Sequence, residues 1–217
     1  MAKFTDKVAV ISGGNQPNSL AMAKKLADEG AKVAILTANA EADAAEFKAC
    51  GAVAYQCNIA SFEEVTNAFN KIKAELGDVD ILINNPNARL DKTLIETTPE
   101  EWQQILATNV HSLFYTCKQV YADMKARRTG KVINFSDPAM MGVAGKAAYA
   151  ITKGSAVGFT GSCAREGEKY TITVNSVTPA GNATPEEVAN TVALLVSEEG
   201  RSFHGQHITV THSWVEA

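Results

Sequence analysis

Short apolar runs alternate with longer amphipathic stretches along the whole chain, and this alternation constrains the fold more than any other feature. Consecutive parallel strands need a crossover between them, which is usually a helix. The pattern therefore predicts an α/β fold in which a doubly wound parallel sheet carries helices on both faces. The expected strands are residues 7–12, 32–36, 53–57, 81–84, 131–136, 171–177 and 206–211, and the expected helices are residues 20–29, 62–76, 99–128, 147–166 and 186–197.

Capping residues bound several of these elements. Ser61 and Thr98 are each followed three residues later by a glutamate, which is the capping box of a helix N-terminus. Gly30 and Gly77 stand where the first two helices should end. No repeat, linker or low-complexity tract divides the 217 residues, so we expect a single domain spanning 1–217.

The composition argues against several classes of function. A net charge of −4 without a basic patch argues against nucleic-acid binding. No apolar run is long enough to span a membrane, and residues 1–7 are too polar for a secretory signal, so we expect a cytoplasmic protein without a membrane partner. We expect no metal site, because no ligand spacing relates the cysteines and histidines, which are Cys50, Cys57, Cys117, Cys163, His111, His204, His207 and His212.

Tyr149 and Lys153 are the residues that point most directly to chemistry. Side chains at positions i and i+4 of a helix lie on one face, so the phenol and the ammonium are neighbours. A nearby cation favours the phenolate and lowers the pKa of the tyrosine. Lowering it from near 10 towards neutrality takes about 4 kcal/mol and would make Tyr149 a general acid or base. The alternative is that Tyr-x-x-x-Lys arises by chance, as it does in many helices.

Other residues accompany this pair in a recognisable order. From the N-terminus these are Ser12-Gly13 after the first strand, Asn84-Asn85 after a later strand, Asn109 in a long helical region, Ser136 at a strand end, Tyr149 and Lys153. This order resembles the short-chain dehydrogenase/reductase family over nearly the whole chain. The resemblance implies a single-domain, Rossmann-type fold that binds NAD(H) or NADP(H).

The chemistry implied by the resemblance is hydride transfer between nicotinamide and a carbonyl or alcohol substrate. Tyr149 would be the general acid or base, and Ser136 would hydrogen-bond the substrate oxygen. Lys153 would hold the nicotinamide ribose and lower the pKa of Tyr149. Asn109 would position a water molecule that links Lys153 to solvent.

Two residues could take the place of the family's catalytic serine, depending on how the sequence is aligned. Counting back from Tyr149 selects Ser136, whereas counting forward from Gly130 selects Asp137. A carboxylate beside a developing oxyanion would oppose carbonyl reduction, so we favour Ser136.

The turn after the first strand is the expected site of the cofactor phosphates, because a helix N-terminus offers free N–H groups and a positive dipole end. Ser12 and Gly13 match the start of the family's turn, but Pro17 and Ser19 replace two later glycines. Ser19, next to Leu20, is predicted to cap the helix and meet a phosphate. This glycine-poor turn is similar to that of the enoyl-acyl-carrier-protein reductase branch, which spaces its tyrosine and lysine more widely. The alternative is an ordinary strand-to-helix loop.

Thr37 stands where a carboxylate would bind the ribose 2′-hydroxyl of NAD and repel the 2′-phosphate of NADP. No arginine or lysine appears at Asn15 or Asn39 to bind that phosphate. We give the missing carboxylate more weight than the missing basic residue, and we therefore predict that NADP(H) is favoured over NAD(H). Asn58, followed by Ile59, takes the place of the family's aspartate at the adenine edge.

Two further segments resemble the family's cofactor contacts. Asn85 and Pro86 resemble the turn beneath the nicotinamide-side ribose. Pro179 belongs to the family's Pro-Gly segment, in which Thr184 would contact the carboxamide or the pyrophosphate. The family normally inserts a few dozen residues after Thr184 as a lid over the substrate, and this chain has essentially none.

Two kinds of function therefore stay open. One is a working oxidoreductase with an open or partner-completed pocket, supported by the four catalytic candidates together. The other is a dinucleotide-binding or scaffold protein that has lost turnover, supported by Pro17, Ser19 and the missing lid. The apolar content of residues 98–128 also predicts a homodimer or homotetramer, as in similar family members, unless this helix faces only the core.

Overall fold

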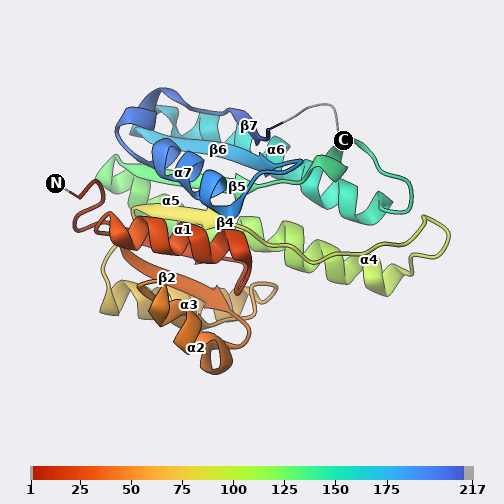
Figure 1. Ribbon diagram of the computed structural model, residues 1–217, viewed down its shortest axis with the longest axis horizontal. Coiled ribbons are helices and arrows are strands. Elements are labelled where there is room, and N and C mark those ends of the chain that lie inside the picture. Colours follow the sequence, from red (N-terminus) through yellow and green to blue (C-terminus); the bar gives the residue numbers. More distant parts are fainter. Residues whose placement is uncertain (1, 213–217) are drawn as a thin grey trace.

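A single parallel sheet forms the centre of the computed structural model, which describes residues 2–212. Its seven strands lie in the order β3-β2-β1-β4-β5-β6-β7 (Figure 1). The predicted doubly wound α/β fold is confirmed, and every expected strand is present. The strands are β1 (Val8–Ser12), β2 (Lys32–Thr37), β3 (Ala52–Gln56), β4 (Ile81–Asn84), β5 (Gly130–Phe135), β6 (Ile172–Pro179) and β7 (His207–Val210).

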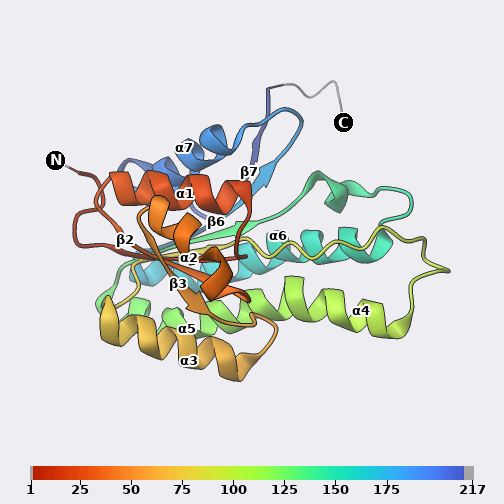
Figure 2. The same ribbon diagram turned by 60° about the horizontal axis from the view of Figure 1, so that its bottom comes forward.

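Helices cover both faces of the sheet (Figure 2). They are α1 (Pro17–Asp28), α2 (Ala40–Ala49), α3 (Phe62–Glu75), α4 (Pro99–Leu106), α5 (Ser112–Arg127), α6 (Ala147–Gly167) and α7 (Pro185–Val196). On one face, α1 packs against α7, while α3, α5 and α6 cover the other face. Successive residues of β1 serve the two cores, because Ile11 packs beneath α1 and α7 and Val10 packs on the opposite side.

The long helical region predicted for 99–128 contains an irregular turn. α4 begins with the capping box of Thr98 and passes into a π-helical turn, Ala107–His111, before α5 continues to Arg127. Such a turn adds one residue to a helical repeat and often marks a functional position. Here it contains the buried Asn109.

Two local expectations were wrong. α2 was not predicted, because Phe47 is its only buried residue and no apolar stripe marks it in the sequence. Ser19 does not cap α1, which begins earlier, at Pro17, so that Ser19 is a buried residue within the first turn of the helix. Proline at the first helical position is a common start, since its fixed φ suits the helix and its missing N–H costs nothing there.

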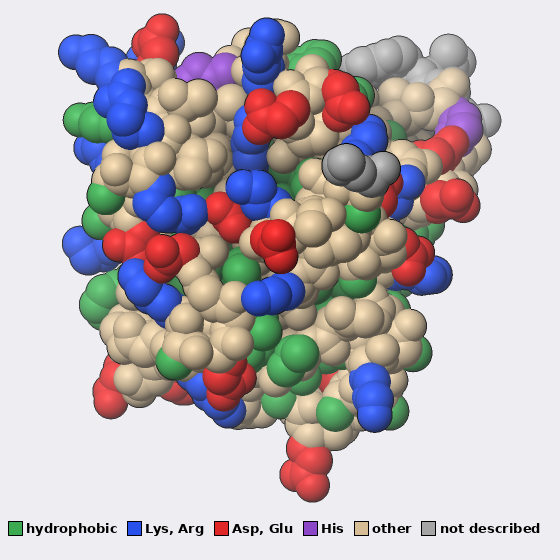
Figure 3. All heavy atoms as spheres, turned by 90° about the vertical axis from the view of Figure 1, so that its left-hand side faces the viewer, with side chains coloured by type: hydrophobic (Ala, Val, Ile, Leu, Met, Phe, Trp, Pro, Cys, Tyr) green, Lys and Arg blue, Asp and Glu red, His purple; other side chains and the backbone are tan. Residues whose placement is uncertain are grey.

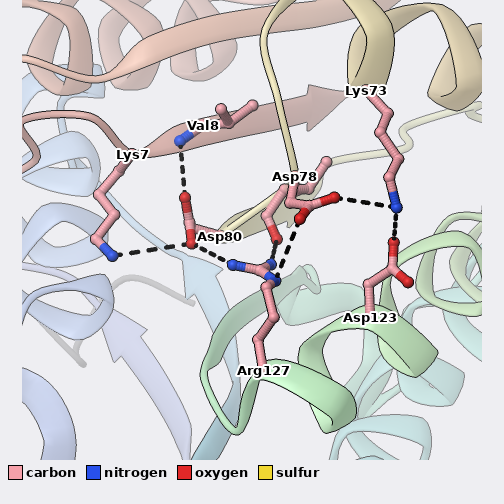
Figure 4. Close-up of polar contacts among 8 residues, drawn as sticks. Lys7, Val8, Lys73, Asp78, Asp80, Asp123 and Arg127 are labelled. Atoms are coloured by element: carbon pink, nitrogen blue, oxygen red, sulfur yellow. Dashed lines mark hydrogen bonds and ion pairs between the residues drawn. The ribbon is translucent and has the colours of Figure 1, made fainter.

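An ion-pair network ties the sheet to α5 at the edge where the strands begin (Figure 4). Asp80 accepts a hydrogen bond from the backbone N–H of Val8 at 3.1 Å and pairs with Arg127 at 2.8 Å. Nearby, Lys73 of α3 pairs with Asp123 of α5 at 2.5 Å. The surface on this side intersperses acidic and basic side chains, without one sign dominating (Figure 3). The network therefore fixes the scaffold at the edge opposite the candidate site.

The carboxyl ends of β1 and β4 mark the place where the winding of the sheet reverses. These neighbouring strands lead into helices on opposite faces, since α1 follows β1 and the α4–α5 region follows β4. In open α/β sheets, ligands bind in the crevice beyond such a reversal point. Within the described residues, no helix is long and apolar enough to cross a membrane.

Candidate active site

A tight turn joins β1 to α1. Gly13 has a φ of +113°, and a Cβ atom there would lie 2.0 Å from the carbonyl oxygen of Asn85, so only glycine fits. Gln16 closes the turn by donating from Nε2 to the carbonyl oxygens of Gly13 at 2.7 Å and Asn85 at 3.3 Å. The backbone before α1 is thereby held against the segment that follows β4.

Two neighbouring cavities lie at this edge of the sheet, and the larger of the pair, beside this turn, has a volume of about 390 Å³. Its walls are residues 13–16, residues 36–39 at the end of β2, residues 57–59 after β3, and residues 86–88 after β4, together with Asp43 and Thr108. The predicted cofactor residues that line it are Gly13, Thr37, Asn58, Ile59 and Pro86.

Asp43, in the first turn of α2, brings a carboxylate to the end of β2. Thr37 donates from Oγ1 to Asp43 Oδ2 at 2.7 Å. Asn15 donates from Nδ2 to Asp43 Oδ1 at 3.2 Å and to Glu46 Oε2 at 2.6 Å. Among the described residues, no lysine or arginine lines this cavity. The predicted NADP(H) preference assumed that no carboxylate lies at the end of β2. The strand end itself has none, but Asp43 of α2 brings one there.

The sequence contains only a weak signal for the position of Asp43. Glu41 and Asp43 both lie in the first turn of α2, where acidic residues are favoured by the helix dipole. Because α2 itself was not predicted, nothing placed these carboxylates near Thr37.

Ser12 is the last residue of β1, Ser19 and Leu20 lie in the first turn of α1, and none of the three lines either cavity. The hydroxyl of Ser12 donates to Asn84 Oδ1 at 3.3 Å, and Asn85 donates from Nδ2 to Ser19 Oγ at 3.0 Å. Both serines are fully buried, and Leu20 packs against the core beneath α1. Their bonds within the protein support the turn, and their predicted contacts with a cofactor stay predictions.

Tyr149, on α6, directs its hydroxyl to two acceptors. Its Oη lies 2.8 Å from Asn87 Oδ1 and 3.0 Å from Asp137 Oδ2. Burial of the ring, together with the negative charge of Asp137 and its hydrogen bond, raises the pKa of Tyr149 above its ordinary value. The pKa of Tyr149 is therefore raised instead of lowered as expected, because burial disfavours the phenolate and the carboxylate of Asp137 adds to that effect.

Lys153 lies one helical turn beyond Tyr149 and is almost completely buried. Its Nζ donates to the carbonyl oxygen of Pro86 at 2.6 Å and stands 5.5 Å from the centre of the Tyr149 ring. Burial lowers the pKa of Lys153 to about 8, although the negative charge of Asp137 acts against that shift. The predicted neighbourhood of ammonium and phenol on one helix face is thus present.

Ser136 and Asp137, at the end of β5, point in different directions. Ser136 donates from Oγ to the backbone carbonyl oxygen of Lys153 at 2.8 Å and lies 3.2 Å from the sulfur of Met140. Asp137, by contrast, faces the hydroxyl of Tyr149. Since successive residues of an extended strand end point to opposite sides, only one of the two can face the phenol. The side chain in contact with the Tyr149 hydroxyl is therefore Asp137, and the predicted hydrogen bond from Ser136 to a substrate oxygen stays a prediction.

Asn109, in the π-helical turn, holds the segment that follows β4 through hydrogen bonds. Its Oδ1 accepts from the backbone N–H of Ala88 at 2.8 Å, and its Nδ2 donates to the carbonyl oxygen of Ala88 at 2.8 Å and to Thr152 Oγ1 at 3.1 Å. These bonds link the stretch carrying Asn87 to α6. The predicted contact of Asn109 with a water molecule stays a prediction.

The smaller cavity, of about 150 Å³, is lined by Asn87 and Asp137, the two residues that the Tyr149 hydroxyl contacts, whereas Tyr149 itself is not part of its wall. Asp137, Lys153 and Pro179 line it, while Gln16 and Asn87 line both cavities. Asn87 donates from Nδ2 to Gln16 Oε1 at 3.4 Å, so this pair stands at the boundary between the two spaces.

Thr184 lies outside both cavities and caps α7. Its Oγ1 accepts from the backbone N–H of Glu187 at 3.3 Å, and Glu187 in turn accepts from the backbone N–H of Thr184 at 2.9 Å. Residues 180–184 form the whole connection between β6 and α7. The predicted absence of a substrate lid stays a prediction.

Comparison with known proteins gives a consistent result. Residues 7–192 match the family model described as short chain dehydrogenase. The chain is 32% identical to 3-oxoacyl-[acyl-carrier-protein] reductase FabG of Escherichia coli (strain K12), over 95% of this chain and 96% of that protein. It is 33% identical to the protein of the same name from Vibrio cholerae, over 94% of this chain and 95% of the relative. It is also 32% identical to acetoacetyl-CoA reductase of Shinella zoogloeoides, over 85% of this chain and 80% of the relative.

Proposed function

This chain belongs to the short-chain dehydrogenase family, and on that premise we propose that it is an oxidoreductase that transfers a hydride between a nicotinamide dinucleotide and a carbonyl or alcohol substrate. One observation carries the proposal. Gln16 and Asn87 are shared walls of the cavity beside the β1–α1 turn and the cavity beside Tyr149. A dinucleotide in the first and a substrate in the second would therefore meet at this boundary.

The larger cavity has features that suit a dinucleotide. The turn at Gly13 leaves no room for a side chain, and the N-terminal end of α1 provides N–H groups and a positive dipole end for phosphates. Pro17 removes one N–H donor but begins the helix, so the dipole is retained. When bound, the nicotinamide would supply or accept the hydride.

The chain's own residues have separate roles in the proposal. Tyr149 would give a proton to the substrate oxygen as the carbonyl carbon is reduced, or take it in the reverse direction. Lys153 would hold the ribose, and its bond to the carbonyl of Pro86 fixes the direction of the ammonium. Asn109 keeps the segment carrying Asn87 in place. The relatives' names describe reductases, which supports reduction as the direction.

Asp43 alters the proposed choice of dinucleotide. A ribose 2′-hydroxyl can donate to a carboxylate at the end of β2, whereas a 2′-phosphate would place its charge against Asp43 and Glu46 without a cation in the wall. The sequence favoured NADP(H) because the absent acid at Thr37 was counted above the absent base, and Asp43 is a structural argument in the other direction. We propose that NAD(H) binds more tightly.

Nicotinamide fluorescence titration followed by a panel of carbonyl substrates tests the proposal. Binding of NADH or NADPH with turnover of a carbonyl supports it, and failure to bind either dinucleotide contradicts it. Binding without turnover of any substrate would favour the second function, a dinucleotide-binding scaffold. The scaffold alternative is supported by the short connection of residues 180–184 between β6 and α7, which leaves no room for an inserted lid over the substrate cavity.

We also propose that the protein forms a homodimer or homotetramer through α5 and α6. Most large apolar side chains of the 98–128 region face the core, among them Ile105, Leu113 and Met124. Phe114 on α5 and Ile151 on α6 remain more than half exposed, at 52% and 57%. A second copy of the chain would cover these positions.

A further inference from the structure

Asp137 brings a carboxylate into the wall of the smaller cavity, in contact with the hydroxyl of Tyr149. Its Oδ2 accepts from the Tyr149 hydroxyl at 3.0 Å, and its Oδ1 accepts from the backbone N–H of Ala139 at 2.9 Å. The side chain is half-buried and lines the smaller cavity. Among the described residues, no lysine or arginine forms an ion pair with it within 4.0 Å. The cavity therefore contains an acceptor with a negative charge that no adjacent cation neutralises by direct contact.

Such a group suits a ketone poorly. A ketone oxygen carries only lone pairs, so it can accept from Tyr149 but can only repel the Asp137 carboxylate. Negative charge develops on that oxygen as the carbonyl is reduced, which strengthens the repulsion in the transition state. Ser136 cannot act as the neutral donor instead, because its hydroxyl is directed to the carbonyl of Lys153.

A substrate with a positively charged N–H at the reacting double bond reverses both effects. We propose that this site reduces protonated imines, with the iminium N–H donated to the carboxylate of Asp137. This inference rests on the proposed hydride transfer and deepens it by naming the substrate class. The hydrogen bond joins two opposite charges, which makes it shorter and stronger than a neutral one.

The reaction balances without a proton from the protein. The imine carbon receives a hydride with its two electrons from the reduced nicotinamide, which is thereby oxidised. The carbon–nitrogen π pair becomes a lone pair on nitrogen, and the nitrogen keeps its proton. The cationic imine ends as a neutral amine, which then takes a proton from solvent. Tyr149 therefore need not be an acid in this reaction, which agrees with a phenol whose pKa is raised by its surroundings.

The other charged groups around the cavity limit where the cation can lie. Lys153 and Arg89 line the same space, and Asp91 acts on Tyr149 from further away. The ammonium of Lys153 is directed to Pro86, and Arg89 is exposed at the rim. Burial lowers the pKa of Lys153 to about 8, which reduces its positive charge in mildly alkaline solution. Asp137 is thus the group that a cationic nitrogen would contact.

Turnover of a matched pair of substrates tests the inference. We expect kcat/KM for the cyclic imine 2-methyl-1-pyrroline to exceed that for cyclopentanone at least tenfold. Asp137→Asn keeps the size of the side chain and the acceptor for Ala139, but removes the charge. It should lower kcat/KM for the imine by roughly ten- to a hundredfold, the scale of one hydrogen bond to a charged group. Asp137→Ser should shift the preference towards the ketone. Asp28→Ser, an exposed change on α1, is the matched control and should alter neither rate.

Binding without turnover provides a second readout. Pyrrolidinium chloride should bind the protein in isothermal titration calorimetry without added dinucleotide, and Asp137→Asn should abolish that binding. Preferential reduction of cyclopentanone by the unaltered protein, or an unchanged imine-to-ketone ratio in Asp137→Ser, would overturn the inference while leaving the hydride-transfer proposal intact. If the protein binds no dinucleotide, the hydride-transfer proposal fails. The pyrrolidinium arm then decides for or against the cation site by itself.

Discussion

The hydroxyl of Tyr149 lies 3.0 Å from the carboxylate of Asp137, a residue 12 positions earlier in the chain, because the end of β5 lies beside the first turn of α6. Burial, together with this contact, raises the pKa of the phenol, where a helix-face ammonium alone would lower it.

Replacing Tyr149 by phenylalanine should separate the two kinds of substrate. For ketones we expect kcat to fall by roughly a hundredfold or more, because the proton donor is lost. For protonated imines the loss should stay below about tenfold, since the nitrogen already carries its proton. Steady-state kinetics with both substrates measures this, with dinucleotide binding unchanged. Tyr170→Phe, a change away from both cavities, is the control. Wild-type ketone turnover in Tyr149→Phe would contradict the role of the phenol.

Lys153 should make the stability of the protein depend on pH. Its folded-state pKa of about 8 lies below the ordinary value of 10.5, so between these values the unfolded chain binds more protons. The free energy of unfolding should therefore rise with pH through this window, by an amount on the order of 3 kcal/mol for the complete shift. Lys153→Met should remove that rise. Urea denaturation at about pH 7.5 and about pH 9.5 compares the two proteins. An equal slope in both would show that Lys153 titrates normally.

Asp43 should set the choice of dinucleotide. In Asp43→Asn, the Kd for NADPH should fall by roughly tenfold while that for NADH rises severalfold, because the charge that repels a 2′-phosphate and binds a 2′-hydroxyl is gone. Glu41→Gln removes an exposed carboxylate from the same helical turn and should leave both constants unchanged. Fluorescence titration measures the Kd for NADH and for NADPH in the unaltered protein and in both variants. Tighter binding of NADPH than NADH by the unaltered protein would argue against our assignment.

Gly13 should tolerate no side chain. Gly13→Ala should lower the free energy of unfolding by roughly 2–4 kcal/mol, because the new Cβ meets the carbonyl of Asn85 and φ is positive. Gly158→Ala, on an exposed part of α6 with no atom within 4 Å of the new Cβ, should instead stabilise by about 0.5–1 kcal/mol. Chemical denaturation of both variants measures the contrast. A neutral Gly13→Ala would mean that the turn relaxes freely.

Ile151 should contribute to self-association. We expect light scattering to show a dimer or tetramer at micromolar concentration, and Ile151→Lys to shift it towards the monomer, because a charge would be buried at the apolar contact. Leu194→Lys, a change at a similarly exposed position on α7, should leave the assembly unchanged. A monomeric unaltered protein would refute the assembly proposal.

What the sequence alone determined were features with a local cause. The alternation of apolar runs predicted the parallel sheet, because side-chain period and element length follow from backbone geometry. The capping residue Thr98 marked the start of α4, and the i, i+4 spacing placed Tyr149 and Lys153 on one helix face. Each of these depends on residues within one or two turns of one another.

The tertiary structure decided what lies opposite those residues. Whether Ser136 or Asp137 faces the phenol depends on how the end of β5 meets α6, and the alternation of strand side chains makes a one-residue shift exchange the two. Asp43 reaches Thr37 only because α2 folds back over the end of β2. Charges act through space, so the pKa of a side chain, and with it the chemistry of the site, follows from neighbours that sequence spacing does not specify.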